Sequence, residues 1–225
     1  KPYCNECDDP CCPHVPNYRS TYSLIGGKLK LLGPIEEYLG SGNEQFVEFS
    51  AASWFFSPDD DNLAVAAGVQ SKMLDDRLYW VAFITNGSES NFAANQIDNY
   101  PGFNIGGWYD FGGTWDESKK KWKLFGDSMS DIDTSENPVL RVGGAADFVP
   151  MHNRSLYGDA EQSRFRTADG GARVVDILNG AGDAKFAVDQ FDAYIFNLFA
   201  ATKYCGFSLS NEWWFRYLTD FDTVP

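Results

Sequence analysis

The chain has 225 residues, and its 18 lysines and arginines against 32 aspartates and glutamates give a formal net charge of −14 at pH 7. This balance argues against a nucleic-acid partner, because binding to phosphates depends on basic side chains that displace counterions. The two histidines and the absence of Gly-x-Ser-x-Gly and His-Glu-x-x-His motifs argue against an enzyme.

Residues 1–17 hold four cysteines and four prolines with almost no large apolar side chain, which predicts an irregular segment. Metal binding through Cys4, Cys7, Cys11, Cys12 and His14 is one interpretation, but the compact spacing fits no standard zinc finger. In an exported protein, disulfides are the better default. We therefore expect no cofactor and no metal, and we treat residues 18–225 as one β-structured unit.

From Tyr18 onward, short apolar or alternating runs lie between turn signals, which is the all-β pattern. The clearest run is Phe103–Trp115, where one parity is rich in aromatic residues and the other is polar or small. Because side chains alternate faces along a strand, this predicts one apolar and one polar face. The glycine pairs inside this run are expected to allow bending or close packing rather than to bind phosphate.

Two hairpins are predicted by turn residues between β-like runs. Ala64–Leu74 and Arg77–Thr85 flank two aspartates, while Val188–Tyr204 and Phe207–Leu218 flank Cys205 and Gly206. A third pair is expected between Gly102–Trp115 and Trp122–Phe125. Val139–Phe148 completes the set, with Arg141, Gly143, Ala145 and Asp147 on one face and Leu140, Val142, Ala146 and Phe148 on the other.

The last strand separates its side chains most clearly by face. Phe207, Leu209, Trp213, Phe215 and Tyr217 share one face, and Ser208, Ser210, Glu212, Trp214 and Arg216 share the other. In a soluble sandwich the aromatic face would be the core, whereas in a membrane barrel it would face lipid. The longest uncharged stretches have eleven residues, which is too short for a membrane helix and about the length of a membrane β-strand.

Four stretches carry a resemblance to a known family: Leu29–Gly68 (LKLLGPIEEYLGSGNEQFVEFSAASWFFSPDDDNLAVAAG), Asp75–Gly87 (DDRLYWVAFITNG), Pro138–Pro150 (PVLRVGGAADFVP) and Ala200–Arg216 (AATKYCGFSLSNEWWFR). In this order they resemble the outer-membrane porins of the phosphate-selective porin O/P family, in its planctomycete-type versions. The chain departs from the family in its N-terminal cysteines, in Cys205 where an arginine is usual, and in its end, which lacks a terminal aromatic residue.

The resemblance implies an antiparallel transmembrane β-barrel of about 16 strands, of which this chain would supply eight or nine. It further implies the bacterial outer membrane as location and lipid and lipopolysaccharide as surroundings. The function would be passive diffusion of small ions or solutes, in a homotrimer. The polar strand faces would line the pore, and the expected pore-lining charges are Arg141, Asp147, Lys203, Glu212 and Arg216.

The charge of the chain limits what the resemblance implies about solutes. An anion filter needs a series of lysines and arginines, and the sequence offers none. We therefore expect a weak preference for cations or no preference at all.

Two alternative interpretations remain open. A secreted β-sandwich that binds carbohydrate or calcium would use exposed tryptophans or the acidic runs Asp59–Asp61 and Asp131–Glu136. These runs lack the spacing of a calcium loop, so a solvated loop is favoured. A metal-binding redox module would rest on the N-terminal cysteines alone.

Overall fold

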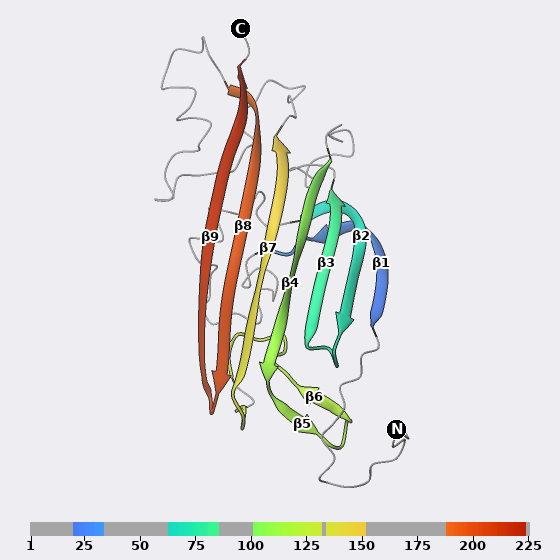
Figure 1. Ribbon diagram of the computed structural model, residues 1–225, viewed down its shortest axis with the longest axis vertical. Coiled ribbons are helices and arrows are strands. Elements are labelled where there is room, and N and C mark those ends of the chain that lie inside the picture. Colours follow the sequence, from blue (N-terminus) through green and yellow to red (C-terminus); the bar gives the residue numbers. More distant parts are fainter. Residues whose placement is uncertain (1–19, 34–62, 86–100, 132–133, 152–187, 224–225) are drawn as a thin grey trace, which may run out of the picture.

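The computed structural model describes residues 20–33, 63–85, 101–131, 134–151 and 188–223 (Figure 1). These residues form nine strands: β1 (Thr21–Lys30), β2 (Leu63–Met73), β3 (Leu78–Thr85), β4 (Gly102–Gly112), β5 (Thr114–Asp116), β6 (Lys121–Lys123), β7 (Val139–Met151), β8 (Val188–Tyr204) and β9 (Phe207–Thr223). Seven of them make one sheet in the order β1-β2-β3-β4-β7-β8-β9, and every neighbouring pair is antiparallel. The predicted all-β, antiparallel fold class is confirmed.

The two hairpins predicted from turn residues are confirmed. β2 pairs with β3 from Met73–Leu78 onward, and β8 pairs with β9 from Tyr204–Phe207 onward. Cys205 and Gly206 both have positive φ, at 50° and 84°, as in the type I′ turn of a two-residue hairpin loop. Glycine adopts this conformation without a steric penalty, which explains why one stands at the second position.

The third predicted strand pair is corrected by the structure. β4 ends at Gly112 and pairs with β7, so only residues 114–116 pair with residues 121–123. The physical reason is the glycine pair: Gly112 and Gly113 have φ of 76° and 92°, which breaks the strand. Phe125, expected in a strand, turns back under the main sheet and is only 2% exposed.

The connections between strands of the main sheet differ in their number of residues at its two ends. The β2–β3 and β8–β9 turns, at the lower end in Figure 1, span only residues 74–77 and 205–206. At the opposite end, residues 31–62, 86–101 and 152–187 join successive strands. The connection from β4 to β7 is the exception, because it is long, lies at the short-turn end and contains the β5–β6 hairpin.

The main sheet is open in the part of the chain that the structure describes. β1 and β9 are its two edge strands, and they do not pair with each other. No helix in the described ranges has the length and apolarity needed to cross a membrane. The predicted irregular segment 1–17 lies outside the described residues.

Candidate functional site

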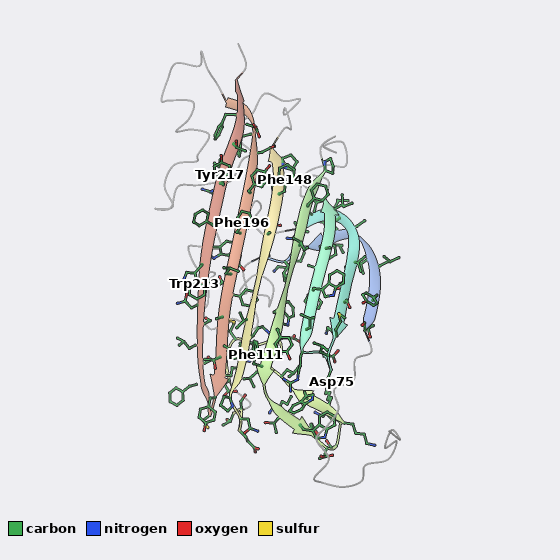
Figure 2. All side chains as sticks on the ribbon, in the orientation of Figure 1. Asp75, Phe111, Phe148, Phe196, Trp213 and Tyr217 are labelled. Atoms are coloured by element: carbon green, nitrogen blue, oxygen red, sulfur yellow. The ribbon has the colours of Figure 1, made fainter. Side chains whose placement is uncertain are left out.

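One face of the main sheet, here called the apolar face, exposes large hydrophobic side chains on all seven strands. Leu24 on β1 is 86% exposed, Leu198 on β8 is 63% exposed and Phe207 on β9 is 81% exposed. The other members include Val65, Ile84, Phe103, Ile105, Phe111, Leu140, Val142, Phe196, Leu209, Trp213, Phe215 and Tyr217, of which Figure 2 labels four. Such a continuous set of exposed large apolar side chains on one face is unusual for a soluble monomer.

Aromatic rings form a row across four neighbouring strands of the apolar face. Phe103, Phe148, Tyr194 and Tyr217 stand opposite one another in the ladders from β4 to β9. Their ring centroids are 6.2, 5.0 and 6.3 Å apart in that order. Such cross-strand aromatic pairs stabilise a sheet, and here they do so on its exposed side.

The opposite face, here called the covered face, packs against residues 31–33 and 124–131. Leu31, Leu32, Phe125 and Met129 from these segments join one buried cluster with side chains of β2, β3, β4, β7 and β8. Gly106 on β4 permits this approach, because a Cβ atom there would lie 2.6 Å from Leu32 Cδ2. The glycine pair at 106–107 therefore serves close packing, as predicted.

A buried ion pair lies on the covered face, near the end of β4 and the start of β7. Arg141 Nε and Nη2 donate to the two carboxylate oxygens of Asp110 over 2.7 and 2.8 Å, and the two side chains are only 5% and 1% exposed. The register explains the pair, since Asp110 and Arg141 are direct partners in the β4–β7 ladder. Arg141 Nη1 also donates to the Gly126 carbonyl over 3.1 Å, so the pair fastens segment 124–131 to the sheet.

Phe125 holds this segment through both its backbone and its ring. Its carbonyl accepts a hydrogen bond of 2.8 Å from Lys203 Nζ, which also lies 4.3 Å from the centroid of its ring. The Arg141 guanidinium lies 4.8 Å from the same centroid and 4.6 Å from that of Trp108. Two buried cations thus share one aromatic ring, an arrangement favoured where water is excluded.

A second polar contact fastens segment 31–33. The Asn104 amide donates to the Leu32 carbonyl over 2.8 Å and accepts from the Leu32 backbone N–H over 3.3 Å. The same amide nitrogen also donates to the Asp147 carboxyl, which is buried. Asn104 and Asp147 are direct ladder partners, like Asp110 and Arg141.

All five charges expected to line a pore lie on the covered face, as strand alternation predicted. Arg141, Asp147 and Lys203 are buried. Arg141 and Lys203 donate to backbone carbonyls of segment 124–131, whereas Asp147 accepts from Asn104 of the neighbouring strand. Glu212 and Arg216 on β9 are half-buried on the same face. Their role as pore-lining residues stays a prediction.

Asp131 joins segment 124–135 to the β8–β9 turn. Its carboxylate accepts hydrogen bonds from the Ser135 hydroxyl over 2.6 Å, from the Ser135 N–H over 2.9 Å and from the Gly206 N–H over 2.8 Å. The sequence favoured a solvated loop here, and this interpretation is wrong for Asp131, which is 6% exposed. Burial acts to raise the pKa of this carboxyl, but hydrogen bonds from Ser135 and Gly206 and the nearby Lys203 outweigh it, so the pKa is lowered.

Asp131→Ala is expected to lower the free energy of unfolding by roughly 1.5–3 kcal/mol, because it removes hydrogen bonds to a buried charge. Since the folded-state pKa is lowered, this stabilisation is complete above the ordinary aspartate pKa and is lost as the pH falls through the lower folded value. Denaturant unfolding from neutral to strongly acidic pH measures the effect. Asp127→Ala, at an exposed position of the same segment, is the control and should change little. A difference between wild type and Asp131→Ala that stays constant with pH would contradict the role of the charge.

The described residues include no group of three or more histidine, cysteine or acidic side chains arranged to hold a metal. Cys4, Cys7, Cys11, Cys12 and His14 lie outside the described residues, as does the acidic run 59–61. Cys205, at the β8–β9 turn, is a free and exposed thiol.

Comparison of the chain with protein-family models, with curated proteins and with solved structures returned no match. The assignment of function therefore depends on the two faces of the sheet and on the resemblance drawn from its sequence.

Proposed function

We propose that the chain is part of an outer-membrane porin, in which the main sheet is a section of the barrel wall and small solutes diffuse along its covered side. The observation that carries the proposal is the apolar face, which is exposed on every strand of the sheet. Burial of apolar side chains in lipid is favourable, whereas their exposure to water is not. The charged groups Asp110, Arg141, Asp147 and Lys203 all lie on the opposite side, away from the proposed lipid.

The lengths of the connections give independent support. Outer-membrane barrels have short connections at one end and long ones at the other. The short β2–β3 and β8–β9 turns lie at one end and the long connections 31–62, 86–101 and 152–187 at the other, with the β4–β7 connection as the exception. Strand length agrees as well. A tilted membrane strand needs about 9–11 residues, and of the seven strands only β3, with 8 residues, is shorter than this. β8 and β9, with 17 residues each, have the greatest length.

The direction of the edge strands supports a larger ring. In an antiparallel sheet of seven consecutive strands, β1 and β9 run in the same direction. In a closed barrel in which every neighbouring pair is antiparallel, the total number of strands is even. Closing a barrel from this seven-stranded sheet would therefore need an odd number of further strands from outside it. Within lipid such closure is required, because unpaired backbone groups at an edge are costly there. A homotrimer in contact with lipid and lipopolysaccharide belongs to the same proposal.

The sandwich alternative has less support. A β-sandwich packs the apolar faces of two sheets together. Within the described ranges the second sheet is only the β5–β6 hairpin, and the apolar face of the main sheet stays exposed.

Two measurements test the proposal. The purified chain should require detergent to remain dispersed, and it should produce discrete conductance steps in planar bilayers. A vesicle preparation without protein and a heat-unfolded sample are the controls. A chain that stays monomeric in plain buffer, with no conductance at any concentration, would overturn the proposal.

A further inference from the structure

The buried charges of the covered face are unsuited to filtering ions. Asp110 and Arg141 neutralise each other at 2.7 Å and are nearly inaccessible. Lys203 is 5% exposed and donates to the Phe125 carbonyl of segment 124–131. Asp147 is 7% exposed and accepts from Asn104, the residue that also binds segment 31–33. A side chain that selects ions must meet them in water, so these four groups contribute little to a passing ion.

An accessible region of the covered face at β1–β3 has a different chemistry. A cavity of about 430 Å³ opens on β1, β2 and β3 near the short-turn end. Its wall includes Thr21, Ser23, Gln70, Lys72, Asp76 and Tyr79. Gln70 is held in place by the Tyr79 hydroxyl, which donates to its side-chain oxygen over 3.0 Å.

The charges of this cavity cancel. Lys72 is positive and Asp76 is negative, and the remaining polar side chains are hydroxyls and one amide. On β9, the half-buried Glu212 and Arg216 likewise balance each other in sign. Uncharged groups that both donate and accept hydrogen bonds match the hydroxyls of a sugar or polyol. A wall whose charges cancel favours neither cations nor anions.

We infer that the cavity on β1–β3 is a subsite for small neutral polyhydroxylated solutes, such as sugars or polyols, rather than for phosphate or other ions. This inference rests on the proposed function and gives it a substrate class. Thr21, Ser23 and Gln70 hydrogen-bond the solute as it passes, and the opposed charges of Lys72 and Asp76 keep the path without ionic preference.

Reversal potentials in planar bilayers under a salt gradient test the charge balance. Wild type should show a reversal potential near zero. Lys72→Glu should become cation-selective and Asp76→Asn should become anion-selective, so the two variants shift the potential in opposite directions. Asparagine suits position 76, where φ is +66°. Lys28→Glu is the matched control, because its register places it on the other face of the same sheet, and it should leave the potential unchanged.

Swelling of protein-containing vesicles in isotonic sorbitol, glucose and sodium phosphate tests the solute class. Wild type should admit the two neutral solutes several-fold faster than phosphate, and Ser23→Tyr, which narrows the cavity, should slow them several-fold. Strong anion or cation selectivity in wild type, with exclusion of sorbitol and glucose, would overturn the inference and leave the porin proposal standing. Absence of both conductance and swelling would instead overturn the porin proposal.

Discussion

Arg141→Met is expected to lower the free energy of unfolding by about 3–5 kcal/mol, because it leaves the Asp110 carboxylate buried without its partner. The carboxylate is 1% exposed and receives both of its strongest hydrogen bonds from this one guanidinium. The substitution also removes the hydrogen bond to the Gly126 carbonyl, so segment 124–131 loses one of its fastenings. Denaturant unfolding in detergent micelles measures the loss.

A double-variant cycle separates the charge from the packing. Asp110→Leu with Arg141→Met removes both charges and keeps much of the buried volume, so the double variant should recover most of the stability that the single variant loses. Lys121→Met, which removes an exposed lysine of the β5–β6 hairpin, is the control and should change stability little. Equal losses in Arg141→Met and in the control would mean that the pair is not needed for the fold.

The faces of the strands could be predicted from the sequence because each strand encodes its own alternation. In β7, the residues Arg141, Ala145 and Asp147 are buried while Leu140 and Val142 are exposed, as the parity of the sequence indicated. In β9 the five predicted aromatic and aliphatic positions are all exposed. The same alternation could not decide between core and lipid, since this depends on what lies against the face.

The contacts of the covered face could not be predicted, because they depend on which distant strands pair. Asp110 meets Arg141 only because β4 pairs with β7 in one register, and Asn104 meets Asp147 for the same reason. The sequence suggested a neighbour nearer in the chain for β4, so Asp110 was not identified as a partner. Phe125 and Asp131 were also missed as buried residues, since nothing in their local pattern reveals that their segment folds back under the sheet.

Leu198→Arg distinguishes a membrane wall from a water-exposed sheet. Leu198 lies near the middle of β8, on the apolar face, with 63% of its surface exposed. In water an arginine at such a site changes stability by no more than about 0.5 kcal/mol. In a bilayer, an arginine near the midplane of a barrel strand costs about 2–4 kcal/mol.

Phe207→Arg supplies the matched control, because it places the same charge on the same face beside the β8–β9 turn. Near the membrane interface the cost falls to about 0–1 kcal/mol, so the two variants should differ clearly when they are unfolded from phosphatidylcholine vesicles. A soluble protein would show small effects at both positions, and a hidden second layer over the apolar face would make both costly. Only a gradient of cost with depth along the strand fits lipid contact, because only a bilayer changes from apolar to polar over the length of β8.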